Sequence, residues 1–176
     1  MLQCGQLFLG LMCREINKAY ERALLFLEKR DRTEKEVSDK LFSLGFSEEA
    51  VLDSIKRLEN AGLINDEAYA GRYLDVLMAK GRGRLRIALE MRRKGLSDEL
   101  VRNTLDDGLS DEDERVHALE AARRAQAAVA EGIDSRKALA KVNRKLISLG
   151  FAYSTIGDVM EQLRHGCADD EEDGEV

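Results

Sequence analysis

The sequence predicts an all-α protein, an elongated array of three tandem three-helix modules with nine helices in all. The main observation is a block that occurs three times along the 176 residues, about 50 residues apart. The chain also has no proline and only 5% aromatic residues, which fits helices joined by short connections better than a sheet. The predicted segments are an apolar N-terminal extension at 1–13, three modules at 14–62, 65–108 and 110–165, and a disordered acidic tail at 168–176.

The repeated block is centred on Gly45, Gly95 and Gly150. Apolar residues recur eight and four positions before each glycine and one, six and ten positions after it. These offsets lie on one stripe of each of two short helices. We expect each glycine to take the left-handed conformation that ends the first helix of the pair, because glycine adopts it without steric cost.

In the first module we expect a helix over 14–29, a second helix after Thr33 and a third from Ser47 to about Gly62. Thr33 and Glu36 match the capping box, in which each side chain accepts a hydrogen bond from the other residue's backbone N–H. The later helices are predicted by similar capping residues and glycine stops. They are expected after Asn65 as far as Gly81, over 84–94, from Ser97, from Ser110, after Asp134 and over 154–164.

Charge is distributed unevenly along the chain. The formal net charge is −6, and residues 169–176 hold six acids, so the rest of the chain is neutral overall. Within that neutral part, cations dominate residues 80–94 and 135–157. The candidate partner-binding residues are Arg82, Arg84, Arg86, Arg92, Arg93, Lys94, Arg136, Lys137, Lys141, Arg144 and Lys145.

Helical spacing places Arg82, Arg86 and Arg93 on one stripe, and it places Lys137, Lys141 and Arg144 on another. Each stripe alone is better explained by a solvated helix face. Because stacked repeats bring equivalent faces side by side, the two stripes together predict one surface for a polyanion or an acidic protein groove. Lys35 and Lys40 of the first module form no such stripe, so we expect them to matter little. The acidic tail is a solvating appendage or competes with a polyanion for the stripes.

The sequence gives little support for catalysis, so we expect no enzyme activity and no cofactor. The two histidines are far apart in sequence, and the GRGR segment at 81–84 follows no strand that would make it a phosphate loop. Acids near residues 98–114 are explained by helix capping rather than by a metal site. The three cysteines are unpaired by spacing and predict reduced thiols in a cytoplasmic protein.

The apolar N-terminus lacks the leading cation of a signal peptide and is too short to span a bilayer. We expect no membrane association. The segment is interpreted as an unstructured extension or as the product of a start codon upstream of the true one, with Met12 as the alternative start. A lipoprotein cysteine at Cys13 is disfavoured because Met12 precedes it.

Three signatures follow one another along the chain: Arg32-Thr33-x-x-Glu36-Val37-x-x-Lys40-Leu41-x-x-x-Gly45-Phe46, Leu58-x-x-x-Gly62-Leu63-Ile64-Asn65-Asp66-x-x-Tyr69-Ala70-x-x-Tyr73 and Lys80-Gly81-x-Gly83-x-x-Arg86-Ile87-x-x-Glu90-Met91-x-x-Lys94-Gly95-Leu96. Together they resemble the RecX family, bacterial regulators of the RecA recombinase. The resemblance covers about residues 15–163, in order and with matching spacing. Arg84 stands where the family usually has proline, and Leu149 where it usually has a cation.

The resemblance implies a bent array of three three-helix modules that lies in the groove of the RecA–DNA filament, blocks strand exchange and ATP turnover, and promotes filament loss. Such an inhibitor would modulate DNA repair and recombination. We expect the protein to be a monomer. It assigns no catalytic residue. Two alternatives remain open from the residues themselves: a free DNA-binding helical regulator, with single- or double-stranded DNA as partner, and a helical scaffold for another protein. A DNA reader needs a recognition helix suited to base edges, and the helices from Ser47, from Ser97 and over 154–164 are acidic or mixed.

Overall fold

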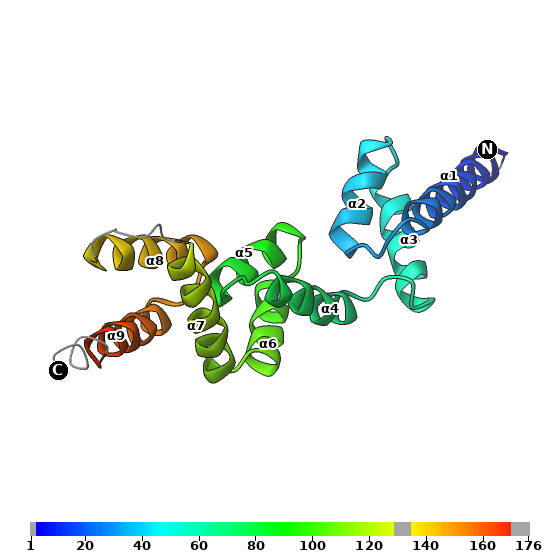
Figure 1. The fold of residues 1–176 in the computed structure, drawn as a ribbon. Helices are drawn as coiled ribbons and strands as arrows, with labels where there is room; N and C mark the ends of the chain where they lie inside the picture. The colour runs from blue at the N-terminus through cyan, green and yellow to red at the C-terminus, as the bar shows by residue number, and fades with distance from the viewer. Residues whose placement is uncertain (1–2, 129–134, 170–176) are drawn as a thin grey trace, which may run out of the picture. The chain divides into compact units, whose positions relative to one another are not determined.

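The computed structural model describes residues 3–128 and 135–169, with side chains over 12–128 and 136–164, and over these residues the fold is entirely helical (Figure 1). The predicted all-α class is therefore confirmed. Beyond Asp169, the predicted acidic tail lies outside the described residues. The helices within the described ranges are α1 (Gln3–Leu27), α2 (Glu34–Ser43), α3 (Glu48–Asn60), α4 (Asp66–Ala79), α5 (Arg84–Arg93), α6 (Asp98–Gly108), α7 (Asp111–Ala127), α8 (Ser135–Leu149) and α9 (Tyr153–Asp169).

Four helices begin at predicted hydroxyl caps. The side chains of Thr33, Ser47, Ser97 and Ser110 accept hydrogen bonds from backbone N–H groups three residues later, at 3.2, 3.4, 3.2 and 3.1 Å. Each bond satisfies one of the N–H groups that the first turn of a helix leaves without an internal partner. The predicted starts of α2, α3, α6 and α7 are thus confirmed.

The first helix is longer than predicted. The sequence suggested a helix over 14–29 after an unstructured extension, whereas α1 begins at Gln3 and ends at Leu27. The extension contains Leu, Met and Gln, which favour helix, and its two glycines each cost only about 1 kcal/mol relative to alanine. A helix already nucleated near Arg14 can therefore continue through this segment.

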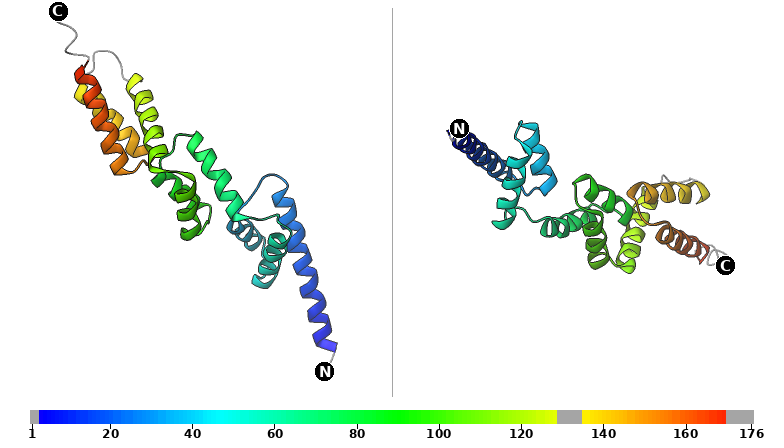
Figure 2. Two further views of the ribbon diagram at one scale, coloured as in Figure 1. Left: turned by 90° about the horizontal axis from the view of Figure 1, so that it is seen from below. Right: turned by 180° about the vertical axis from the view of Figure 1, so that it is seen from behind.

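The chain forms two compact units: unit 1 comprises the residues up to Ala70 together with Arg92–Leu100, and unit 2 comprises Gly71–Met91 and the chain from Val101 onward. The residues of the predicted second module are divided between them. In unit 1, α1, α2 and α3 pack against one another, as both views of Figure 2 show. Their shared core consists of Ala19, Ala23, Val37, Leu41, Ala50, Val51, Ile55, Leu58 and Ile64.

Unit 2 has its own core among α7, α8 and α9, which contact one another pairwise. Small Ala118 and Ala122 on α7 allow close approach of Leu146 on α8 and Val159 on α9, all of which are fully buried. Gly45, Gly95 and Gly150 have φ values of 84°, 90° and 80°. The predicted left-handed turns after α2, α5 and α8 are therefore confirmed.

Candidate functional site

The turn that follows α5 packs against the start of α2, and both segments belong to unit 1. The Thr33 hydroxyl donates a hydrogen bond of 2.6 Å to the backbone oxygen of Lys94. The Lys94 ammonium in turn lies 2.7 Å from the carboxylate of Glu36. A Cβ on Gly95 would come within 2.3 Å of the Lys35 side chain. Glycine at this turn is thus required both by the left-handed backbone and by the close approach of α2.

Unit 2 contains an equivalent arrangement at the start of α5. The backbone N–H groups of Gly83 and Leu85 donate to the backbone oxygens of Leu149 and Gly150, at 3.0 and 2.9 Å. A Cβ on Gly150 would lie 2.6 Å from the backbone nitrogen of Arg86. The turn after α8 therefore packs on the start of α5 as the turn after α5 packs on the start of α2.

A carboxylate caps the first backbone N–H of the receiving helix in both places. Asp66 accepts from the Glu34 N–H at 2.9 Å, and Glu114 accepts from the Arg84 N–H at 3.0 Å. Glu114 also accepts from the Ala152 N–H at 3.2 Å, while its side chain is only 2% exposed. One buried carboxylate thus joins the starts of α5 and α9. The sequence analysis missed this role because the two N–H groups lie 30 and 38 residues away along the chain.

Glu36 is an ionised group held within unit 1. Burial by itself would raise the pKa of Glu36, but the hydrogen bond and charge of Lys94, the Thr33 backbone N–H and the charge of Arg32 lower it overall. Its neighbours behave differently. Burial raises the pKa of both Glu34 and Asp66, with nearby carboxylates adding to the effect.

Arg84 is engaged inside unit 2. Its guanidinium lies 3.1 Å from Asp106 and 3.7 Å from both Asp111 and Glu114, and it donates to the backbone oxygen of Leu109. Its side chain is 23% exposed. These contacts fix the start of α5 at Arg84, the position where the family that the signatures resemble usually has proline.

The other predicted cations near α5 are mostly paired. Arg82 precedes α5, so the helical-spacing argument that placed it on a stripe with Arg86 and Arg93 does not hold. Arg86 pairs with Glu90 at 2.9 Å, and this hydrogen bond is the main cause that lowers the pKa of Glu90. Among the described residues, exposed Arg93 forms no ion pair. The remaining two are paired in unit 1, Arg92 with Asp98 at 2.5 Å and Lys94 with Glu36.

The cations of α8 present a different picture. Arg136, Lys137, Lys141, Arg144 and Lys145 are all exposed, and the helix carries no acid. Val142 and Leu146, on the opposite side, are fully buried in the core of unit 2, as predicted. Within the described part of the chain, the three lysines form no ion pair. We define the α8 cationic face as Arg136, Lys137, Lys141, Arg144 and Lys145. Among the described residues, it is the largest set of exposed predicted cations on one helix.

The family model "RecX, first three-helix domain" matches residues 19–58, and "RecX, second three-helix domain" matches 65–105. Regulatory protein RecX of Clostridium perfringens strain SM101 is 33% identical over 151 residues, which span 85% of this chain and 70% of the relative. This chain belongs to the RecX family. Regulatory protein RecX of Chlorobium phaeobacteroides is 30% identical, over 83% of this chain and 93% of the relative.

Solved RecX structures share the fold. The crystal structure of RecX from Lactobacillus salivarius superposes with a TM-score of 0.78 at 29% identity, covering 86% of this chain and 98% of that one. A second crystal structure of regulatory protein RecX gives a TM-score of 0.79 at 25% identity, covering 92% and 79%. The relatives carry the name of regulators. Among the residues described here, no helix is long and apolar enough to cross a membrane.

Proposed function

We propose that this RecX-family protein binds the nucleoprotein filament of the RecA recombinase and inhibits its strand exchange and ATP hydrolysis. Membership of a family of regulatory proteins supports a role in controlling another protein's activity. We assign the contact with the filament to the α8 cationic face. This face has five exposed cations, and the helix carries no acid. Such a face attracts the anionic surface of a protein–DNA assembly.

Contact through α8 requires little rearrangement of the protein. Lys137, Lys141 and Lys145 are exposed and form no ion pair in the described part of the chain, so contact through these three lysines breaks no existing pair. Arg84 and Lys94 are paired with carboxylates, and their release would leave those carboxylates uncompensated. We therefore place the main filament contact on α8 of unit 2, and we assign a smaller share to Arg84 of unit 2 and Lys94 of unit 1.

Direct binding to DNA is the second candidate, and the same face favours it because phosphate groups attract any exposed cluster of lysines. A base-reading recognition helix receives no support, since α3 begins with Glu48 and Glu49 and α6 with Asp98 and Glu99. DNA binding by α8 would therefore be independent of sequence and strongly dependent on salt.

Fluorescence anisotropy separates the two candidates. Labelled single-stranded DNA is titrated with the protein alone, and RecA filaments on unlabelled DNA are titrated with labelled protein. We expect the affinity for filaments to exceed the affinity for bare DNA by about tenfold or more at physiological salt. Equal affinities would favour the free DNA-binding regulator instead.

A further inference from the structure

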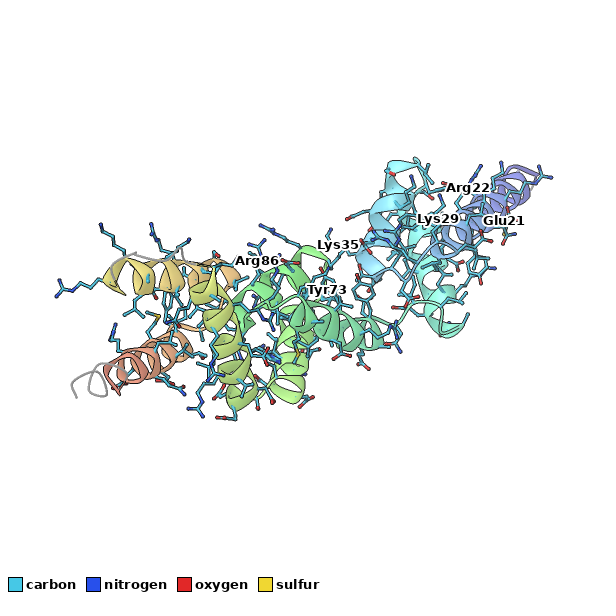
Figure 3. The ribbon with its side chains drawn as sticks, in the orientation of Figure 1. Glu21, Arg22, Lys29, Lys35, Tyr73 and Arg86 are labelled. Carbon is cyan, nitrogen blue, oxygen red and sulfur yellow. The ribbon has the colours of Figure 1, made fainter. Side chains whose placement is uncertain are left out.

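A second cationic surface lies in unit 1, where a groove of about 980 Å³ runs between α1 and α2. Lys18, Arg22 and Lys29 reach it from α1 and the residues just after that helix, and Lys40 reaches it from α2. Figure 3 labels Arg22 and Lys29 on this part of the molecule, together with Glu21, the one acid of the groove. All five side chains are exposed, and none forms an ion pair among the described residues.

The floor of this groove is apolar. Leu25 is 50% exposed and Leu44 is 48% exposed, although both are large hydrophobic residues. Phe26 and Phe46 lie beside them and are half-buried against the core of unit 1. Single exposed leucines are ordinary on a protein surface, but apolar side chains gathered in a concave site rimmed by charge are typical of a site for a partner.

The chemistry of the groove indicates the kind of ligand. Four cations against one acid favour an anionic partner, and the apolar floor favours one with large hydrophobic side chains. A nucleic-acid backbone would satisfy the cations but would leave Leu25 and Leu44 exposed to water. An amphipathic acidic segment satisfies both parts of the site. We propose that the groove between α1 and α2 binds an acidic peptide segment of a partner protein, with apolar side chains on its floor and carboxylates at its rim.

This proposal does not rest on the α8 cationic face or on the proposed inhibition of RecA. The two surfaces belong to different units and are altered by different substitutions. Sequence analysis missed the groove because its cations come from α1, the segment after it and α2, and they form no stripe on any single helix. The proposed groove also changes the expectation for Lys40, which the sequence suggested would matter little for binding.

The test uses the full-length protein and a labelled synthetic peptide of glutamates with leucines at the i, i+3, i+4 and i+7 positions. Two groove variants are compared, Lys18→Glu with Arg22→Glu, and Leu25→Ser. The matched controls reverse two exposed cations, Lys56→Glu with Arg102→Glu, and change one exposed leucine, Leu52→Ser. None of these residues lines the groove. Circular dichroism first establishes that all variants keep the helical content of the parent.

We expect the parent to bind the peptide in fluorescence anisotropy titrations. Each groove variant should lose about tenfold in affinity, while each control should change by less than about twofold. A leucine-free polyglutamate should bind more weakly than the amphipathic peptide. The proposal is overturned if groove and control variants lose affinity equally, if the peptide does not bind, or if an oligonucleotide of equal charge binds more tightly and only the Lys18 and Arg22 changes weaken it.

Discussion

At the scale of single residues, the three turn glycines share one conformation but differ in their surroundings. A Cβ on Gly45 would meet nothing within 4 Å, whereas on Gly95 it would meet the Lys35 side chain and on Gly150 the backbone of Arg86. The repeat in the sequence alone predicts equal costs for substituting them. The contacts instead predict a graded cost.

We expect Gly45→Ala to lower the free energy of unfolding by about 1–2 kcal/mol, because the left-handed backbone is the only obstacle. Gly95→Ala should cost more, and Gly150→Ala should cost about 3 kcal/mol or more, since the backbone of α5 must move. Urea denaturation of the three variants measures these differences. Equal costs would show that the close approaches at Gly95 and Gly150 contribute nothing.

Glu114 is predicted to be the most sensitive acid of unit 2. Glu114→Ala removes the acceptor for two partly buried N–H groups and one of the carboxylate partners of Arg84, and should lower the free energy of unfolding by about 3 kcal/mol. Glu114→Gln keeps an acceptor and should cost less. The control Glu112→Gln loses only an exposed pair with Arg115 and should change stability by less than about 0.5 kcal/mol. Comparable losses for both sites in chemical denaturation would refute the capping role.

Glu36 should contribute to acid sensitivity. Its pKa is lower in the folded protein than the ordinary value of 4.5, so its stabilising contribution is present above that value. It is lost as the pH falls through the lower folded pKa. We therefore expect Glu36→Gln to destabilise the protein at pH 7 and to differ little from the parent at pH values below the folded pKa. Thermal melting across this range checks it, and a difference that persists in acid would contradict it.

At the scale of helices, elements governed by local sequence were predictable. The caps at Thr33, Ser47 and Ser110 and the left-handed glycines depend on residues close together in the chain. The buried role of Glu114 depends on partners 30 and 38 residues away, which no local pattern reveals. The candidate site was predicted unevenly for the same reason: the α8 cations are exposed as expected, but Arg84 has acidic partners more than 20 residues away that helical spacing could not identify. The partner of Arg86 is Glu90, four residues later on the same helix, and helical spacing could have identified this pair.

The contact between the turn after α5 and the start of α2 includes an ion pair that is missing from the contact between the turn after α8 and the start of α5. Two substitutions could introduce that pair at the second contact. At the start of α2, Glu36 pairs with Lys94, whereas at the start of α5 the corresponding positions hold Arg86 and Leu149. A double-mutant cycle of Arg86→Glu and Leu149→Lys should therefore show a favourable coupling of about 1 kcal/mol, because it recreates the pair of unit 1. Zero coupling in chemical denaturation would show that the two contacts are not equivalent.

At the scale of the whole molecule, each unit has its own core and its own cationic surface. The α8 face belongs to unit 2, and the groove between α1 and α2 belongs to unit 1. Substitutions on the cationic surface of one unit should therefore leave the other unit folded. Substitutions confined to exposed cations should separate binding from stability.

The most direct test of the proposed function is DNA-dependent ATP hydrolysis by RecA. The parent protein should inhibit hydrolysis when added at fewer molecules than RecA. The triple variant Lys137→Glu, Lys141→Glu and Lys145→Glu should require about tenfold more protein for the same inhibition. A control that reverses the exposed cations Lys56, Arg102 and Arg123 should inhibit as the parent does. If the folded parent protein does not inhibit hydrolysis, the proposed function is contradicted. If the triple variant inhibits as strongly as the parent, α8 does not make the filament contact.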